Sequence, residues 1–289
     1  MTFDPLMVPV ATQIIGESLP ISSSGHMMLA WAMLERFGKA AVQVPDFFDH
    51  FLHGPTIIII ALYFFNAWWA LVRMLMAAMR AWAHGGCWYA TLRASHKRML
   101  GMVVYVAWLV AIADIITAIC YVFVHVMFKN THFLHSLPML LIGFSLTSVI
   151  LLSSRGLREG TEKITASKAL ILGLVQGLAL LPGISRFACT VIIAQWLGIS
   201  TRRALQFSFL MFFPLIVAAF FVNGLPAFIK DSSARIFILP QWLVVYAVAA
   251  IVAYGLFVIA CCMVQRKQLW WFGLYMIFPI SLVVLLLVG

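Results

Sequence analysis

Long apolar segments separated by short polar ones dominate the pattern along this chain. Six of them have, or approach, the roughly 20 residues that a helix needs to cross a bilayer. They are Phe51–Leu75, Met99–Phe128, Leu137–Leu152, Ala204–Val222, Gln241–Val264 and Leu269–Val288. Polar or basic residues separate each pair. The pattern predicts an all-α polytopic membrane protein with about six transmembrane helices, in a single integral membrane domain over residues 1–289.

Two further apolar regions are too short to cross. Each holds about a dozen residues before a Pro/Gly break, the length of half-helices that enter and leave a membrane by one face. The breaks are GESLPISSSGH at 16–26 and LPGISR at 181–186. The sequence predicts two re-entrant helical hairpins there, at about 6–45 and about 169–200.

The two breaks align at a constant offset of 163, which places Gln13 on Gln176, Ser22 on Ser185 and Ser23 on Arg186. Such an internal repeat is typical of inverted-repeat membrane proteins. We expect a first repeat at about 6–128 and a second at about 137–289. Three predicted spans separate the hairpins, so the hairpins should enter from opposite faces and their tips should meet inside the membrane.

Composition and charge limit the class of protein further. Hydrophobic residues make up 64% of the 289 residues, charged residues 10%, and the mean hydropathy is +1.05, which excludes a water-soluble globular domain. The net charge of +10 would favour nucleic acid only on a soluble basic domain. Basic residues instead gather in alternate connections, which places those connections in the cytoplasm. The N-terminus, MTFDPLM, shows no signal peptide.

The polar residues of the two breaks favour an anionic ligand. Half-helix N-termini at membrane depth present N–H groups and a positive dipole end. Ser22, Ser23, Ser24 and Gly25 offer hydroxyls and backbone donors, and Arg186 offers a planar fork for phosphate oxygens. The alternative is structural: a Glu–Arg pair with helix-capping serines.

At these residues the chain resembles the bacterial undecaprenyl-pyrophosphate phosphatase family of the bacitracin-resistance type. GESLPISSSGH is similar to the first motif of that family, and LPGISRFACT at 181–190 is similar to the second. FDHFLHG at 48–54, and FSFL at 207–210 followed by Pro214, resemble two further stretches. The departures are Gln13 in place of the first motif glutamate, Phe187 and Ala188 in place of small residues, and Met276 after Tyr275.

The resemblance implies an enzyme that removes the terminal phosphate from a polyprenyl pyrophosphate, recycling the carrier lipid for cell-wall glycan synthesis. It would work with Mg²⁺ or Ca²⁺, often as a homodimer, in the bacterial cytoplasmic membrane with its site open to the outer face. The matching positions implied as catalytic are Glu17, Ser23, His26 and Arg186. Those implied for the substrate are Ser22, Ser24, Gly25, Ser185, Thr190 and His53. Glu17 and Gln13 would hold the cation.

Three nucleophiles stay open: a serine of the 22–24 run, preferably Ser23 with His26 as its base, His26 itself, or water deprotonated by His26 or Glu17. Asp49 and His53 could shape the mouth of the pocket or reach a metal. Asp114 could replace the charge lost at Gln13, but a buried contact to a neighbouring helix fits it better.

A second function class also fits the pattern. A transporter or lipid-phosphate binder could use the same cavity to move a prenyl phosphate, with hydrolysis weakened. Gln13, Phe187 and Met276 favour this alternative. Phosphate release distinguishes the two, because a carrier would bind the lipid and release no phosphate.

Overall fold

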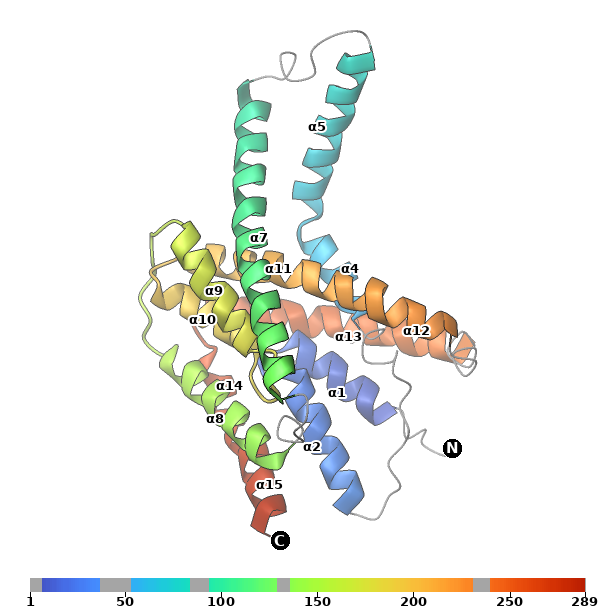
Figure 1. Cartoon of the computed structure of the whole chain (residues 1–289), viewed down its shortest axis with the longest axis vertical. Coiled ribbons are helices and arrows are strands. Elements are labelled where there is room, and N and C mark those ends of the chain that lie inside the picture. Colours follow the sequence, from blue (N-terminus) through green and yellow to red (C-terminus); the bar gives the residue numbers. More distant parts are fainter. Residues whose placement is uncertain (1–6, 37–52, 84–93, 129–135, 231–239, 289) are drawn as a thin grey trace.

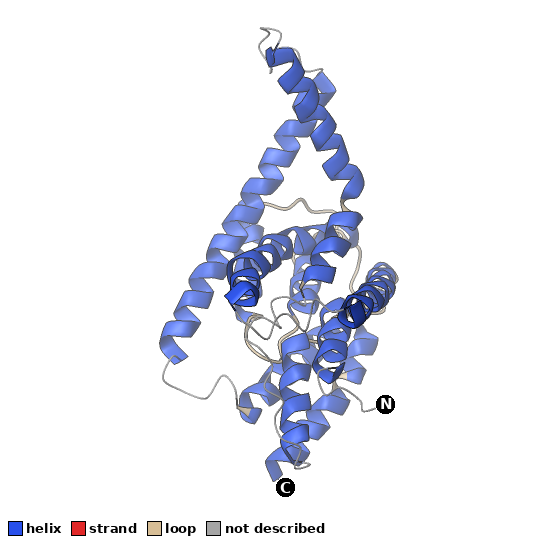
Figure 2. Ribbon diagram, turned by 90° about the vertical axis from the view of Figure 1, so that its right-hand side faces the viewer, coloured by secondary structure: helices blue, strands red, loops and turns tan. Residues whose placement is uncertain are grey.

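A computed structural model describes residues 7–36, 53–83, 94–128, 136–230 and 240–288 (Figure 1). Helices account for all the regular structure in these ranges (Figure 2), apart from one isolated bridge between Glu162 and Ile199. Four helical stretches there are long and apolar enough to cross a membrane, at 97–128, 201–230, 244–265 and 270–288. The prediction of an all-α polytopic membrane protein is confirmed.

Four of the six expected spans are these stretches. They correspond to α7 (Ala94–Phe128), to α11 (Thr201–Ala218) with its continuation, to α13 (Pro240–Gln265), and to α14 (Trp270–Tyr275) with α15 (Ile277–Val288). The continuation of α11 is the π-helix η2 (Ala219–Gly224) and α12 (Leu225–Lys230).

The other two expected spans differ from a straight crossing helix. The segment expected at 51–75 forms α4 (Gly54–Tyr63) and α5 (Phe65–Ala83), which bend by 65° at the break, and its first two residues lie outside the described ranges. Helix α8 (Leu137–Ser153) is apolar but has 17 residues, fewer than a full span. The hydrophobic pattern located both segments, but their local geometry was not predictable from it.

Two helix-turn-helix units hold the polar breaks. The first consists of α1 (Met7–Ser18) and α2 (Ser23–Arg36), and the second of α9 (Ala166–Leu178) and α10 (Arg186–Trp196). Within each unit the two helices pack against each other. Helices α2 and α10 begin at Ser23 and Arg186, the two residues that the sequence offset aligns.

Helix α7 packs along α9, and these two helices lie side by side in Figure 1. Glycine permits the close approach, because a Cβ at Gly173 would lie 2.4 Å from the Ala113 carbonyl oxygen. The Gln176 amide of α9 donates to the Asp114 carboxylate of α7 over 3.0 Å. The interpretation of Asp114 as a buried contact to a neighbouring helix is therefore confirmed.

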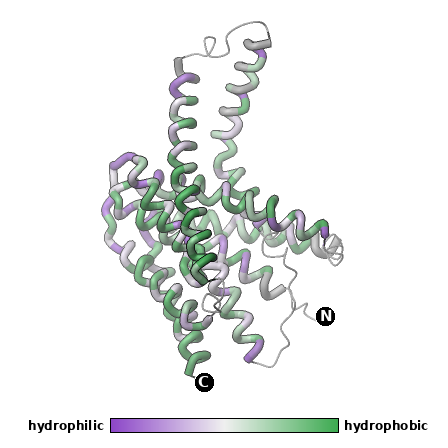
Figure 3. Tube along the Cα trace, viewed as in Figure 1, coloured by the Kyte–Doolittle hydropathy of each residue, from purple (hydrophilic) through white to green (hydrophobic). Residues whose placement is uncertain are grey.

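Most residues along the helices are hydrophobic (Figure 3), and many of the large ones are exposed. Val149, Ile251 and Leu285 are 63%, 72% and 67% exposed. Water would penalise so many exposed large side chains, whereas lipid tails accommodate them. The described helices thus present the surface of an integral membrane protein.

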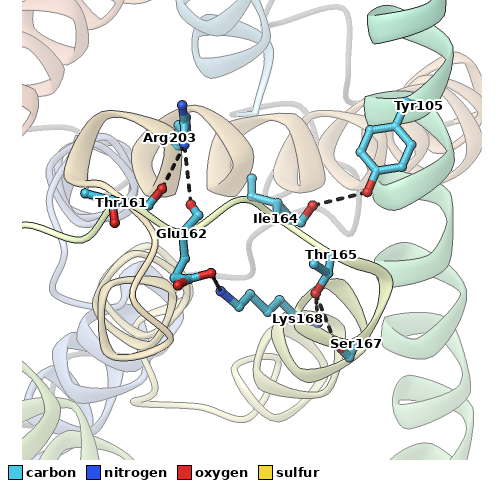
Figure 4. A network of polar contacts seen from close by, with 8 residues as sticks. All are labelled: Tyr105, Thr161, Glu162, Ile164, Thr165, Ser167, Lys168 and Arg203. Carbon is cyan, nitrogen blue, oxygen red and sulfur yellow. Dashed lines mark hydrogen bonds and ion pairs between the residues drawn. The ribbon is translucent and has the colours of Figure 1, made fainter.

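The connection between α8 and α9 is held by polar contacts (Figure 4). Arg203 donates to the carbonyl oxygens of Thr161 and Glu162, and Lys168 pairs with the Glu162 carboxylate over 3.7 Å. Glu159 accepts hydrogen bonds from the N–H and the hydroxyl of Thr201, at 2.8 and 2.5 Å. Lys267, between α13 and α14, also lies 3.6 Å from Glu159. Basic residues from the start of α9, the start of α11 and the α13–α14 connection therefore meet here.

Candidate active site

One cavity receives both polar turns. It measures about 820 Å³ including the open space at its mouth, and helices α1, α2, α4, α10, α11 and α13 contribute to its lining. Most of the residues that sequence analysis singled out line it. These are Glu17, Ser22, Ser23, Ser24, His53, Ser185, Arg186 and Thr190. The structure therefore brings together residues from two regions that are far apart in the sequence.

The two turns have matching geometry. The Ser22 hydroxyl accepts a hydrogen bond from the N–H of Gly25, and the Ser185 hydroxyl accepts one from the N–H of Ala188, both over 3.3 Å. Each serine therefore caps the helix that follows it. The backbone at Ser22 has a positive φ of 68°, an uncommon conformation for a residue with a side chain. Both helix N-termini, with their partial positive charge, adjoin the cavity.

The two turns touch through their backbones. A Cβ at Gly25 would lie 2.8 Å from the Gly183 Cα and 2.6 Å from a ring carbon of Phe144, so no larger residue fits between them. Thr147 of α8 fixes the second turn: its hydroxyl donates to the Gly183 carbonyl over 2.8 Å and accepts from the Ser185 N–H over 2.9 Å. Sequence analysis missed Thr147, which had no signal beyond a hydroxyl in an apolar helix.

Glu17 and His53 form a hydrogen-bonded pair in the cavity wall. The Nδ1 of His53 lies 2.6 Å from a carboxylate oxygen of Glu17, and the two side chains are 17% and 6% exposed. A carboxylate acceptor requires that Nδ1 carries the proton. This is the arrangement in which a carboxylate orients an imidazole and stabilises its charged form.

Arg186 provides positive charge at the start of α10. Its guanidinium lies over the Phe212 ring, 4.4 Å from the ring centroid, and it lines the cavity. The buried Nε has no hydrogen-bond partner among the described residues. An unpaired N–H on a charged group adjoining a cavity suits an anionic guest.

Three predicted site residues do not line the cavity. Gln13 is buried within α1, and Gly25 is occupied by its contact with the second turn. His26 packs behind the first turn. Its Nδ1 donates to the Ser22 carbonyl over 2.8 Å, so the Nε2 of the neutral ring accepts from the Tyr275 hydroxyl over 3.1 Å. In this structure His26 supports the turn from outside the cavity, and its catalytic role stays a prediction.

The hydroxyl of Thr190, a predicted substrate-binding residue, already has a protein partner. Thr190 lines the cavity, but its hydroxyl donates to the Arg186 carbonyl over 2.9 Å, so that proton is already used. Asp49 lies outside the described residues.

The cavity also has an aromatic part. Phe187, Phe209 and Phe257 line it, with ring centroids 5.3 Å apart for the first pair and 4.9 Å for the second. Sequence analysis had noted Phe187 as a departure from the motif but did not place it in a wall. The cavity lining therefore combines groups that suit an anion with groups that suit a hydrocarbon.

Comparison with known proteins identifies the family. The family model described as "Bacitracin resistance protein BacA" matches residues 11–280. The chain belongs to the BacA family. This confirms the resemblance that the two polar breaks indicated.

Curated relatives cover most of the chain. The chain is 30% identical over 273 residues to a protein of Borrelia hermsii named undecaprenyl-diphosphatase, with 94% of each chain covered. It is 30% identical over 274 residues to one of Syntrophotalea carbinolica with the same name, covering 91% of this chain and 90% of the relative. A relative from Methanosphaera stadtmanae, also named undecaprenyl-diphosphatase, is 29% identical over 235 residues.

The oxygen donors at the cavity of this BacA family member suit a hard cation. The described part of the chain holds no group of three or more His, Cys, Asp or Glu side chains able to bind a metal ion. One carboxylate, that of Glu17, adjoins the cavity together with serine hydroxyls. This donor set fits a hard cation that shares its coordination with phosphate oxygens, as Mg²⁺ often does.

Proposed function

We propose that this protein hydrolyses undecaprenyl pyrophosphate to the monophosphate and inorganic phosphate. The observation that carries the proposal is the cavity itself. Its lining joins two helix N-termini, Arg186 and the Glu17–His53 pair with three phenylalanines. The names of the curated relatives support the same reaction.

Neutralising charge is the first requirement of the reaction. A pyrophosphate monoester carries two to three negative charges, and its terminal phosphorus cannot be attacked readily until these are balanced. Arg186 and the N-termini of α2 and α10 supply fixed positive charge in a site shielded by protein. Ser185 still has a hydroxyl proton to donate, because its hydroxyl accepts the capping hydrogen bond. The Ser22 hydroxyl also accepts its capping bond, and it lies 3.5 Å from the Ser24 hydroxyl.

The Glu17–His53 pair supplies the base in this proposal. It removes a proton from the nucleophile, either the Ser23 hydroxyl or a water molecule, and Glu17 stabilises the imidazolium that forms. The nucleophile oxygen bonds to the terminal phosphorus as the bond to the bridging oxygen breaks, and the lipid monophosphate leaves. If Ser23 attacks, water then hydrolyses the phosphoserine and releases inorganic phosphate.

Glu17 would hold a divalent cation, Mg²⁺ or Ca²⁺, together with phosphate oxygens. Gln13, the other predicted ligand, lies one turn earlier in α1 and outside the cavity lining. When bound, the cation would add positive charge beside the phosphates.

The proposal places the protein in the bacterial cytoplasmic membrane, with the cavity open to the outer face. Basic residues concentrate on the cytoplasmic side of membrane proteins, so Arg203, Lys168 and Lys267 support a cytoplasmic position for the α8–α9 connection. A homodimer stays a prediction from the family resemblance.

Phosphate release from undecaprenyl pyrophosphate by the purified protein in detergent tests the function. We expect release that depends on Mg²⁺ or Ca²⁺, stops with EDTA and is abolished in Arg186→Ala. Arg266→Ala is the matched control, because Arg266 is exposed near the opposite end of α13 from Pro240 and does not line the cavity. Binding of the lipid without any release would overturn hydrolysis and favour the carrier alternative.

A further inference from the structure

Two buried polar atoms without a hydrogen-bond partner belong to the same cavity. Within the described residues, the Nε of Arg186 and the hydroxyl oxygen of Ser208 both have this property, and both residues line the cavity. Buried polar groups are normally paired, so unpaired ones that adjoin a cavity indicate a missing ligand.

Ser208 differs from several other helical hydroxyl residues of the part of the chain that the structure describes. It lies within α11 and is 4% exposed. Thr117, Thr190 and Ser281 lie in helices too, and each donates to the carbonyl oxygen four residues earlier, at 2.9 to 3.0 Å. That local bond is the usual way to satisfy a hydroxyl inside a helix. Ser208 lacks it, so burying its hydroxyl gives no stability in return.

The position of Ser208 on α11 relates it to Arg186. Phe212, whose ring carries the Arg186 guanidinium at 4.4 Å, follows Ser208 by four residues. Residues four apart lie on one face of a helix, about one turn from each other. Ser208 and the guanidinium therefore lie on the same side of α11, the side that packs against α10.

We propose that Ser208 is a further substrate-binding residue, whose hydroxyl donates to a phosphate oxygen that Arg186 also binds. This rests on the proposed function. The site is specific in its chemistry: it takes an oxyanion that can accept from a guanidinium and a hydroxyl together. It adds a third element, α11, to a phosphate site otherwise made by the two polar turns.

The test compares the native protein with Ser208→Ala and with Ser281→Ala as a matched control. Ser281 is also a helical serine, but it is exposed and its hydroxyl is satisfied by Ile277. KM and kcat are measured with undecaprenyl pyrophosphate, binding with the non-hydrolysable methylenediphosphonate, and Tm without ligand. We expect Ser208→Ala to raise KM and the methylenediphosphonate Kd by about 10-fold, the effect of losing a hydrogen bond to a charged group.

The thermal stability of Ser208→Ala should not fall, in contrast to its substrate binding. Because the Ser208 hydroxyl has no protein partner, Ser208→Ala should leave Tm unchanged or raise it. A lower Tm with unchanged KM and Kd would mean a structural role and would overturn the proposal, as would no change in any of the three. If the native protein binds methylenediphosphonate but releases no phosphate, hydrolysis fails while the Kd of Ser208→Ala still decides this proposal. If it neither binds nor hydrolyses, both proposals fall.

Discussion

The Tyr275 hydroxyl lies 3.1 Å from Nε2 of His26, although 249 positions separate the two residues in the sequence. Their rings are also stacked, with centroids 5.8 Å apart. The other ring nitrogen holds the Ser22 carbonyl. Tyr275 thus fixes the imidazole that in turn fixes the first polar turn.

Replacing Tyr275 by Phe tests this link. We expect phosphate release to fall about 3- to 10-fold, the effect of losing one hydrogen bond that orients a group beside the site. Tyr105→Phe is the control, because the Tyr105 hydroxyl donates to the carbonyl of Ile164 in the connection between α8 and α9. An unchanged rate in Tyr275→Phe would show that the turn keeps its geometry without this bond.

A double-mutant cycle tests the Glu17–His53 pair. Glu17→Gln keeps the size of the side chain but removes its charge, and His53→Gln removes the imidazole. Each should slow release by about 100-fold or more, since general base catalysis contributes roughly 10²–10⁴-fold. Because the two act as one unit, the double variant should be little slower than either single one. Losses that multiply would mean that the two residues act separately.

Gly25→Ala should disturb the contact between the two turns. The added methyl would lie 2.6 Å from a Phe144 ring carbon and 2.8 Å from the Gly183 Cα. Overpacking of this kind costs about 1–3 kcal/mol, so we expect a lower Tm and slower release. Gly101→Ala is matched to it, because a Cβ there meets nothing within 4 Å, and its Tm should not fall. Equal Tm values for the two variants would contradict the close contact.

The Glu159 contact predicts a pH dependence of stability. The hydrogen bond from the Thr201 hydroxyl is the main cause that holds the pKa of the Glu159 carboxyl below its usual value, helped by the Thr201 N–H and Lys267. A carboxyl with a lowered pKa in the folded state stabilises that state above its usual pKa, and this stabilisation is lost as the pH falls through the folded-state pKa.

The measurement is Tm between pH 8 and pH 3 for the native protein and Glu159→Gln. We expect the native protein to have the higher Tm at neutral pH and the difference to shrink below about pH 4.5. Thr201→Val, which removes one of the two Thr201 donors, should reproduce part of the loss. A difference that stays constant with pH would show that the charge of Glu159 is not involved.

The sequence predicted the helical membrane class, the two breaks and their meeting in one cavity. It could do so because hydrophobic length and the paired serine turns are local signals. The residues behind the site were not predictable in the same way. Ser208 lies in the FSFL stretch and Tyr275 beside Met276, both noted in the sequence. The apolar pattern around them and around Thr147 nevertheless does not show which hydroxyl faces a turn or a cavity.

Dependence on distant partners also explains why the structure places His53 in the cavity lining and His26 outside it. Both lie close to a polar motif, but the direction of each ring depends on distant partners, Tyr275 for one and Glu17 for the other. Sequence spacing alone favoured His26 as the base of Ser23. The cavity lining includes His53 and leaves His26 behind the turn.

The backbone contact between Gly25 and Gly183 has a consequence for how the site adapts. Side chains can change rotamer to make room, but two touching main chains cannot, and Thr147 ties one of them to α8. The spacing of the two turns is thus fixed. Any adaptation of the cavity to different guests must come from side chains of its lining, such as Phe187, Phe209 and Phe257, which can change rotamer while the two touching main chains stay in place.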